Sequence, residues 1–399
     1  MGQGGAERAL LESAWQQLDK DALLTDTYKF VSIASPTGDE SAFAEAFAAY
    51  LKSMGLSEVK IDREFPSSPS VIGRLRPSGT SVGSTLQLDG HSDAIVIPHE
   101  PARLDATSGI VHGRGAADMK GGLVAMAHAV RAICAAEISL RGELLFTVHG
   151  LHEAPGGDQR TLRGLLKRGF AGDAALIAEL SHDSVPIASK GMSIFRFTVG
   201  REGGVMHEAE LTERDRNPLV VGRKLLSRLE ELARTGQERT DELLGMESVF
   251  LGQVHGGDFY NRVPQSLEVE GTRRYFSPSS NEDIEKELSA IAREVQSESS
   301  LPVHVTVQPV AAPYSLDAEE PIVAALRAGY RLATGRVLPV SGARAVGNAA
   351  DFVAAGVPAV YHGVNQETAH SDQECVHVED LLRAARVYVA TIVGFCGAR

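Results

Sequence analysis

Four short apolar runs, each followed within a few residues by histidine or a carboxylate, constrain the fold of this chain more than any other feature. The runs cover 84–88, 144–148, 174–178 and 358–361, and each has the length of a buried strand. Helical material separates these runs, and an early helix is indicated by Phe43, Phe47, Tyr50 and Leu51. This alternation predicts a mainly parallel sheet flanked by helices. Ligands of such sheets bind outside the carboxyl ends of the strands, where the polar residues follow.

The rhythm of the sequence changes between residues 191 and 307. A strand is expected over 193–199, a helix over 218–232, strands over 248–254 and 266–275, a helix over 281–295 and a strand over 303–307. This β-α-β-β-α-β order is that of a ferredoxin-like α+β domain. Helix–strand alternation returns from residue 320. We therefore predict an α/β domain over 1–189 and 309–399, with a second domain inserted over 190–308.

Composition excludes several classes of partner. The formal net charge is −13 and only 6% of residues are aromatic, so neither nucleic acid nor an anionic membrane is an expected partner. No apolar stretch approaches the roughly 18 residues that span a bilayer, and no secretory signal is visible. Three scattered cysteines argue against a disulfide framework and a thiolate zinc site. We expect a cytoplasmic protein.

The segment LDGHSDAI places His91 at the end of a predicted strand, with Asp93 two residues later. A metal-bound imidazole is usually oriented through its other nitrogen, and a nearby aspartate can provide that contact. The alternative is a loop histidine beside an aspartate that caps a turn.

The segment HGRGAADMKGG places Asp118 just before a predicted helix. Its position alone predicts that this aspartate is a helix N-cap. Gly121 and Gly122 in the first turn cost roughly 1 kcal/mol each relative to alanine, which indicates that another backbone or a ligand comes close.

Three further segments place metal-binding residue types after strands. LHEAPGG contains His152 and Glu153, AALIAEL ends near Glu179, and ETAHSDQE contains His370. A carboxylate at a buried strand end must be paired or bound to metal, so Glu179 either forms a salt bridge with Lys190 or an arginine, or serves as a ligand. Two histidines and three carboxylates that follow separate strands fit a carboxylate-bridged two-metal site.

Several motifs together are specific to one family. The chain resembles the dinuclear zinc hydrolases in the segments GHSD, GRGAADMKGG, AEL followed by SKG, NRVP, and AHSDQE followed by VEDL. That family includes glutamate carboxypeptidase, aminoacylase, succinyl-diaminopimelate desuccinylase and the di- and tripeptidases. The similarity runs in order over nearly the whole chain, and it implies a metallopeptidase-like catalytic domain with an inserted lid and dimerisation domain.

The resemblance implies roles for individual residues. His91, Asp118 and Glu179 would hold one divalent ion, while Asp118, Glu153 and His370 would hold a second, with Asp118 as the bridge. The peptide bond that is cis in the family corresponds to Asp118–Met119.

The inserted domain is given roles by the same resemblance. His207 matches a histidine that reaches the active site of a partner subunit and stabilises the oxyanion, which implies a homodimer or higher homo-oligomer. Asn261 and either Arg273 or Arg274 match residues that hold a substrate carboxylate. The alternative for the two arginines is pairing with acidic residues of their own domain.

One position departs from the family pattern. The general base of the family is a glutamate directly before the metal-binding glutamate, and here the register puts His152 in that place. Histidine can accept and pass on a proton as glutamate does, or it could contact the metal or the substrate instead.

The sequence therefore predicts a metal-dependent hydrolase that cleaves a carbon–nitrogen bond of a small carboxylate-bearing substrate, with His152, Asp93 and His207 as catalytic residues. Its ligand types admit one or two Zn, Mn or Co ions. Two alternatives stay open. An aminohydrolase would release ammonia from an amino-substituted carboxylic acid, aromatic acids included. A non-catalytic homologue would keep the fold as a binding protein.

Overall fold

The computed structural model describes residues 3–77, 83–343 and 345–398, which form two compact units. The larger unit contains residues up to 187, 316–341 and residues from 351 onward, and the smaller contains 188–315 and 342–350. The predicted boundaries at 190 and 308 therefore lie close to the two ends of 188–315. No helix among the described residues is long and apolar enough to cross a membrane.

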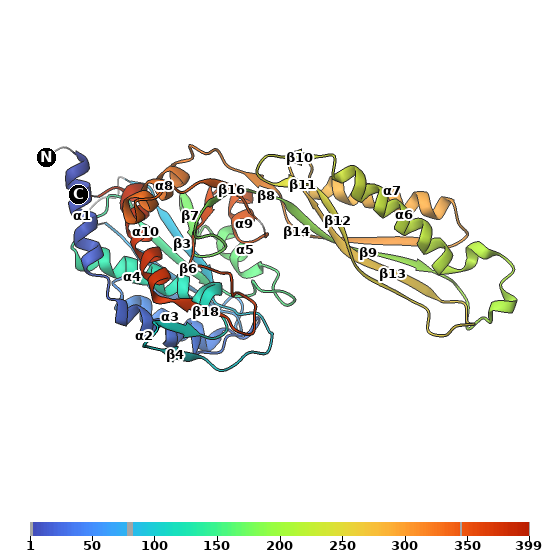
Figure 1. The fold of residues 1–399 in the computed structure, drawn as a ribbon, viewed down its shortest axis with the longest axis horizontal. Helices are drawn as coiled ribbons and strands as arrows, with labels where there is room; N and C mark the ends of the chain where they lie inside the picture. Colours follow the sequence, from blue (N-terminus) through green and yellow to red (C-terminus); the bar gives the residue numbers. More distant parts are fainter. Residues whose placement is uncertain (1–2, 78–82, 344, 399) are drawn as a thin grey trace. The chain divides into compact units, whose positions relative to one another are not determined.

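A six-stranded sheet forms the centre of the larger unit (Figure 1). Its strand order is β1-β2-β6-β3-β7-β17. The strands are β1 (Lys60–Asp62), β2 (Ser70–Leu75), β3 (Leu86–His91), β6 (Leu144–His149), β7 (Ala174–Ile177) and β17 (Ala359–Tyr361). β6, β3, β7 and β17 run parallel to one another, while β1 and β2 are antiparallel neighbours at one edge. The predicted mainly parallel sheet is confirmed, and all four parallel strands consist of buried residues, as their apolar runs require.

Helices pack on this sheet and on one another. They are α1 (Gln3–Gln16), α2 (Lys20–Val31), α3 (Ser41–Ser53), α4 (Gly121–Ala135), α5 (Arg160–Lys167), α8 (Pro321–Thr334), α9 (Ala349–Ala354) and α10 (Val378–Cys396). α3 contacts β1 and β2, α4 contacts β3, α8 contacts β7 and β17, and α10 packs against α4 and α8. The predicted early helix is α3, and its Phe43 and Phe47 rings stack with centroids 5.4 Å apart.

Small sheets connect segments that are far apart in the sequence. β18 (Cys375–His377), β5 (Ile110–His112) and β4 (Arg103–Asp105) form one, with Cys375 paired to His112. Another consists of β15 (Tyr314–Ser315), β8 (Val185–Ser189) and β16 (Val340–Gly342). A short local pair is formed by β10 (Thr240–Asp241) and β11 (Gly245–Met246), which are neighbours in the sequence. The β18–β5 pairing brings the segment after His370 beside the segment that leads to Asp118.

The smaller unit has the predicted β-α-β-β-α-β order. Its elements are β9 (Gly191–Gly200), α6 (Pro218–Gly236), β12 (Ser248–Gly256), β13 (Ser266–Tyr275), α7 (Asn281–Ser297) and β14 (Val303–Ala311). The strands form an antiparallel sheet in the order β12-β13-β9-β14. Every second residue of β9 is buried, and these side chains form a core with residues of α6 and α7. The expectation of a ferredoxin-like arrangement agrees with this order.

Candidate metal centre

The carboxyl ends of β3 and β7 bring the first three predicted ligands together. His91 is the last residue of β3 and is fully buried. Its Nε2 lies 3.2 Å from Asp118 Oδ1 and 3.5 Å from Glu179 Oε2. Glu179 follows β7 by two residues and is 2% exposed. One imidazole nitrogen and two carboxylates thus face a common point.

A second group forms on the other oxygen of Asp118. His370 Nε2 lies 3.3 Å from Asp118 Oδ2 and 2.9 Å from Glu153 Oε1. His370 has a left-handed backbone with φ of 62° in the turn that precedes β18. The two oxygens of Asp118 therefore face different histidines, which is the arrangement that a bridging carboxylate needs.

The main-chain carbonyl of Asp93 orients His91. His91 Nδ1 lies 2.9 Å from that oxygen, which can only accept a hydrogen bond, so Nδ1 carries a proton. A metal ligand needs this arrangement, because Nε2 is then the nitrogen that gives up its proton when an ion binds. The Asp93 carboxylate lies farther away, with Oδ1 3.6 Å from Nδ1. We expected Asp93 to provide the orienting contact, and its main-chain carbonyl makes the shorter one.

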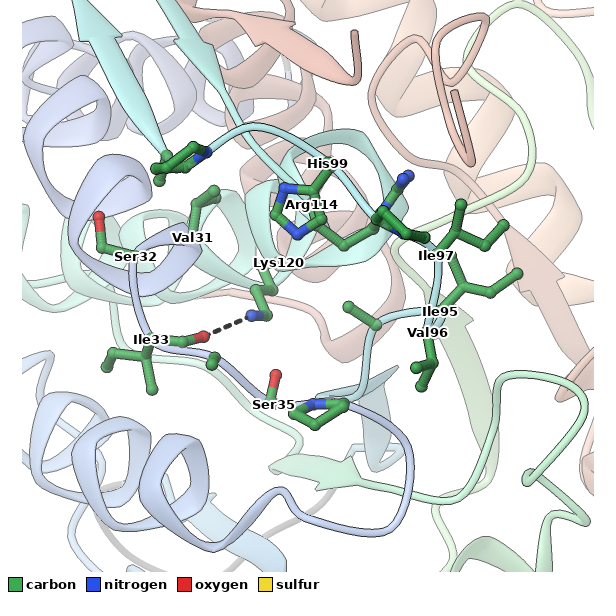
Figure 2. Close-up of a pocket in the computed structure, with 16 residues that line it drawn as sticks. Val31, Ser32, Ile33, Ser35, Ile95, Val96, Ile97, His99, Arg114 and Lys120 are labelled. Atoms are coloured by element: carbon green, nitrogen blue, oxygen red, sulfur yellow. Dashed lines mark hydrogen bonds between the residues drawn. The ribbon is translucent and has the colours of Figure 1, made fainter. Parts of the chain in front are cut away.

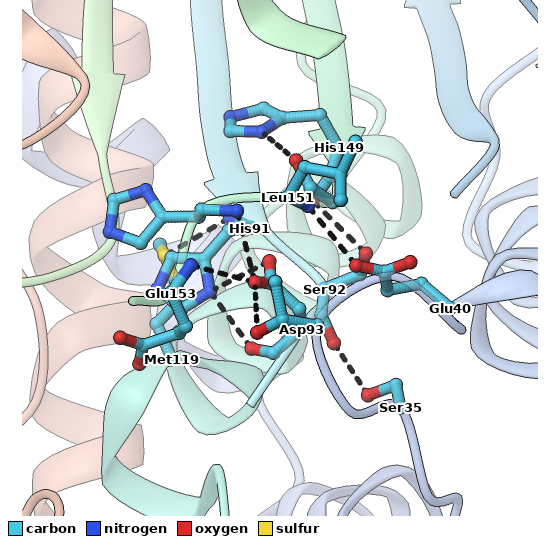
Figure 3. A network of polar contacts seen from close by, with 12 residues as sticks. Ser35, Glu40, His91, Ser92, Asp93, Met119, His149, Leu151 and Glu153 are labelled. Atoms are coloured by element: carbon cyan, nitrogen blue, oxygen red, sulfur yellow. Dashed lines mark hydrogen bonds and ion pairs between the residues drawn. The ribbon is translucent and has the colours of Figure 1, made fainter. Parts of the chain in front are cut away.

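The Asp93 carboxylate instead holds the turn that follows β6 (Figure 3). Its Oδ2 accepts hydrogen bonds from the main-chain N–H groups of His152 and Glu153, at 2.9 and 2.8 Å, and from Thr37 Oγ1 at 3.0 Å. Burial alone would raise the pKa of Asp93, but the contacts with His91 and the hydrogen bonds from the turn hold it below its usual range. An ionised Asp93 therefore fixes the position of Glu153.

Glu374 positions the backbone that carries Asp118. Its Oε1 accepts hydrogen bonds from the N–H groups of Ala117 and Asp118 at 3.0 and 3.1 Å, and its Oε2 pairs with Arg114 Nη1 at 2.9 Å. The Asp118–Met119 peptide bond is cis, as the resemblance implies. Residues 118 and 119 have non-helical dihedral angles and separate the preceding turn from α4.

Gly121 and Gly122 allow α4 to begin against other backbone segments. A Cβ at Gly122 would lie 2.3 Å from the carbonyl oxygen of Ala178, and one at Gly121 would lie 2.5 Å from that of Ala116. The predicted close approach is therefore an approach of backbone. Because Ala178 directly precedes Glu179, the missing side chain of Gly122 lets the start of α4 meet the segment that carries this carboxylate.

The electrostatics of these residues fit a divalent cation. Among the described residues Glu179 pairs with His91, while Lys190 donates a hydrogen bond to the Met246 carbonyl instead. Oε1 of Glu179 is buried without a hydrogen-bond partner. Hydrogen bonds to Asp118 and Glu153 raise the pKa of His370 to about 10. Burial would lower the pKa of His91, but its contacts with carboxylates hold it well above its usual value. Three carboxylates here attract positive charge, and two imidazole nitrogens complete a set of N and O ligands that suits zinc or manganese.

His152 lies flat against His91. The ring centroids are 4.0 Å apart and the planes are inclined by 1°. The lone pair of an imidazole nitrogen lies in the plane of its ring, and a metal bound to it sits about 2.1 Å away in that plane. An ion on His91 would consequently lie too far from the parallel plane of His152 to bind both. Although one of its nitrogens lies near a ring nitrogen of His91 and a carboxylate oxygen of Glu179, His152 would not bind the same ion as His91 in this conformation.

His207 and Asn261 contact each other in the smaller unit. His207 Nδ1 accepts a hydrogen bond from the N–H of Ala209 at 3.2 Å, so the proton of the neutral ring is on Nε2. The Asn261 side-chain amide lies 3.1 Å from Nε2, and its oxygen is the atom able to accept that proton. His207 is exposed and Asn261 is half-buried.

The two adjacent arginines of β13 have different surroundings. Arg273 is fully buried, and its guanidinium lies 2.6 Å from Glu247 and 2.9 Å from Glu287. Removing this arginine from two buried carboxylates would be costly, which argues against a role in binding substrate. Arg274 is only partly buried. It stays the candidate for a substrate carboxylate.

A cavity of about 590 Å³ lies in the larger unit beside the chain segments that carry the ligands (Figure 2). Apolar residues of 31–36 and 94–102 line most of it, and Lys120 in its wall donates a hydrogen bond to the Ile33 carbonyl at 2.8 Å. Burial lowers the pKa of Lys120 to about 8. None of the predicted site residues lines this cavity.

Sequence reasoning missed three residues that hold the site. Glu374 supports Asp118, as described above. Gln366 accepts a hydrogen bond from the N–H of Leu180 at 2.7 Å and donates one to the Ala117 carbonyl at 3.2 Å, which links the segments of two ligands. The side-chain amide of Gln159 lies 2.8 Å from His152 Nδ1. Glu374 ends the motif ETAHSDQE and Gln366 directly precedes it, which was the available signal, whereas Gln159 lies in no motif.

Comparison with known proteins agrees with this geometry. The profile of peptidase family M20/M25/M40 matches residues 87–393. A succinyl-diaminopimelate desuccinylase of Methylobacterium radiotolerans is 26% identical over 391 residues, covering 92% of this chain and 95% of the relative. An N-formyl-4-amino-5-aminomethyl-2-methylpyrimidine deformylase of Halalkalibacterium halodurans is 22% identical over 423 residues, covering 96% of each chain. The crystal structure of aminopeptidase PepT from Bacillus cereus has the same fold, with a TM-score of 0.80, 17% identity, and coverage of 95% of this chain and 99% of that one. With the family profile spanning three quarters of its length, this chain belongs to peptidase family M20/M25/M40 and is a metal-dependent hydrolase of amide or peptide bonds.

Proposed function

We propose that the chain hydrolyses the acyl carbon–nitrogen bond of a small substrate that carries a carboxylate. The observation that carries this proposal is the position of Asp118, whose two oxygens face His91 and His370 in separate groups. His91, Asp118 and Glu179 would hold one divalent ion, and Asp118, Glu153 and His370 a second. Their nitrogen and oxygen ligands suit Zn, Mn or Co.

Divalent ions bound there would lower the pKa of a water molecule and polarise the acyl carbonyl group. The protein supplies the proton transfers. His152 occupies the position next to Glu153 and lies against His91, from where it would take a proton from the attacking water and pass it to the leaving nitrogen. Asp93 acts indirectly, since it holds the backbone of His152 and Glu153.

The smaller unit would contribute to substrate binding. Because His207 carries its proton on Nε2, it could donate a hydrogen bond to an acyl oxygen that gains negative charge if that oxygen replaced the Asn261 amide as its partner. Arg274 and Asn261 would hold the substrate carboxylate. N-succinyl and N-formyl compounds are the first candidates, because the relatives with those names match over most of their length.

A homodimer through the smaller unit is part of the proposal. β12 lies at an edge of the four-stranded sheet and exposes Phe250 and Val254, and Phe259 and Tyr260 are exposed in the following loop. An edge strand with exposed apolar side chains favours pairing with a second copy.

The test combines metal content with hydrolysis. Purified protein is loaded with Zn²⁺ or Mn²⁺ and assayed against N-succinyl amino acids, N-formyl amines and dipeptides, with primary amine and ammonia measured separately. We expect about two ions per chain and release of acid and amine. Glu179→Gln should lose one ion and activity, whereas Asp183→Asn, an exposed carboxylate four residues later, should lose neither. Free ammonia as the product would favour an aminohydrolase instead, and a wild-type chain that takes up no metal would refute the proposal.

A further inference from the structure

We propose that the cavity between residues 31–36 and 94–102 binds a small organic acid, whose carboxylate pairs with Lys120 and whose apolar body fills the remaining space. All residues that line this cavity belong to the larger unit, and none of them is a proposed metal ligand or substrate-binding residue. The site would therefore be separate from the metal centre, and the proposal does not depend on the reaction.

Lys120 is a buried cation in the wall of this cavity (Figure 2). Its side chain is 1% exposed, its Nζ donates a hydrogen bond to the Ile33 carbonyl oxygen at 2.8 Å, and this nitrogen lies 5.2 Å from the centre of the Phe43 ring. Both contacts are with uncharged groups, and in the ranges that the structure describes Lys120 forms no ion pair. Burying an ammonium group without a counterion is costly, so this position favours an anion.

Two carboxylates attract Lys120 electrostatically, Glu374 and Asp93, but each is engaged by other groups. Glu374 pairs with Arg114 at 2.9 Å and accepts hydrogen bonds from the N–H groups of residues 117 and 118. Asp93 accepts hydrogen bonds from the N–H groups of the turn after β6. The positive charge of Lys120 therefore lacks a counterion of its own, and the carboxylate of a ligand would supply one.

Hydrogen-bond donors are in excess in the same wall. An ammonium group has three donors, and one of those of Lys120 is used by Ile33. Nε and Nη2 of Arg114, which also lines the cavity, are buried without a hydrogen-bond partner. The hydroxyl of Ser35 is already engaged, because it donates to the Ser92 carbonyl oxygen at 2.6 Å. A carboxylate carries acceptors only, so it matches this excess of donors better than an amine or an alcohol does.

The remaining wall is mainly apolar, which selects the body of the ligand. It includes Val31, Ile33, Pro36, Ala94, Ile95 and Pro98. Two further residues of the wall, Val96 and Ile97, are 63% and 38% exposed, and a ligand with a hydrocarbon chain would cover this apolar surface. The volume of about 590 Å³ is that of clefts that enclose small ligands. Ala34 and His99 in the wall are exposed, so the cavity can be entered from solvent.

Calorimetric titration of the full chain with straight-chain acids tests the proposal. Acetate, butyrate, hexanoate and octanoate are compared, with 1-octanol as the uncharged probe. We expect affinity to rise by about fourfold for each CH₂ group that enters the cavity. Octanoate should bind about tenfold or more tightly than octanol, because only the acid pairs with the ammonium group. Each titration is repeated with added Zn²⁺, and octanoate binding that requires Zn²⁺ would show the acid on a metal ion and overturn the proposal.

Variants locate the bound acid. Lys120→Met should bind octanoate no better than octanol, whereas Lys52→Met, which removes an exposed lysine of α3, should bind octanoate as the wild type does. Ala34→Phe should weaken octanoate and octanol together, because it takes up space in the cavity without changing the charge. Since Ala34 is exposed, this variant keeps the test decisive if Lys120→Met does not fold.

Three results would overturn the proposal. The first is octanoate binding that Lys120→Met and Ala34→Phe both leave unchanged. The second is loss of octanoate binding in Arg274→Met, because the acid would then occupy the proposed substrate site in the smaller unit. The third is no binding of octanoate to the wild type at millimolar concentration. None of these results involves hydrolysis, so the outcome is independent of whether the proposed function holds.

Discussion

Replacing Gly122 with alanine would place a methyl group where α4 meets the segment that carries Glu179. The new Cβ would lie 2.3 Å from the Ala178 carbonyl oxygen and 2.9 Å from the Ala178 Cβ. Both neighbours are held by the backbone of a buried segment, so the helix and the segment must separate by about 1 Å to restore ordinary contact. Overpacking of this kind costs about 3 kcal/mol at the upper end of the usual range. Alanine returns about 1 kcal/mol through its higher helix propensity. We expect a net loss of about 2 kcal/mol.

Gly394→Ala is the matched control. Gly394 also lies inside a helix, α10, but a Cβ there would meet nothing within 4 Å. This variant should gain about 1 kcal/mol from helix propensity alone. The urea midpoints of the two metal-free variants should therefore move in opposite directions.

Metal binding adds a second measurement for Gly122→Ala. Metal–ligand distances tolerate only about 0.2 Å, so a displaced Glu179 should weaken binding of the ion that His91 shares with it. Titration calorimetry with Zn²⁺ measures the change. If Gly122→Ala proved as stable as Gly394→Ala and bound Zn²⁺ normally, the close approach would not constrain the site, and the reasoning would be wrong.

Three further predictions concern residues outside the ligand set. Glu374→Ala should lower the free energy of unfolding by about 3–5 kcal/mol, because it leaves Arg114 as an uncompensated buried charge; urea unfolding measures this. It should also lower the metal content, because the backbone of Asp118 loses a hydrogen bond, and elemental analysis measures that. Burial lowers the pKa of His362 to about 3. Between pH 6.5 and pH 3 the unfolded chain therefore binds a proton on this residue and the folded chain does not, so the free energy of unfolding decreases as the pH falls through this range. Between pH 7 and pH 5 this residue should account for about 2 kcal/mol, which His362→Gln should remove from the measured pH dependence; equal slopes in both proteins would contradict it. Phe250→Glu should convert a dimer to a monomer in light scattering, while a wild type that is already monomeric would exclude the dimer.

The architecture and the ligand positions could be predicted because each depends on local pattern. His91 and Glu179 lie at or just after apolar runs, and the runs form neighbouring parallel strands. His370 was found through its motif, and its contact with Glu153 depends on the pairing of β18 with β5.

The supporting residues could not be predicted in the same way. Glu374 contacts Asp118, a residue 256 positions earlier, so no local pattern reveals the hydrogen bond. Gln159 owes its contact to two left-handed residues that enclose the loop. The difference between Arg273 and Arg274 follows from strand alternation. Arg273 has the same alternation as the buried Val269 and Tyr275 of β13, and adjacent strand residues point to opposite faces.

The order of the proposed ligands along the chain would let the two proposed metal sites form at different times during synthesis. His91, Asp118 and Glu179 all precede the smaller unit in the sequence. The second group includes Glu153, which also precedes the smaller unit, and His370, which follows the smaller unit. At 5–20 residues per second, a ribosome takes roughly 10–40 s to make the stretch of about 190 residues between Glu179 and His370. A nascent chain can thus present three ligands for the first ion before the smaller unit has been translated. The second ion can be captured only when the protein is nearly finished.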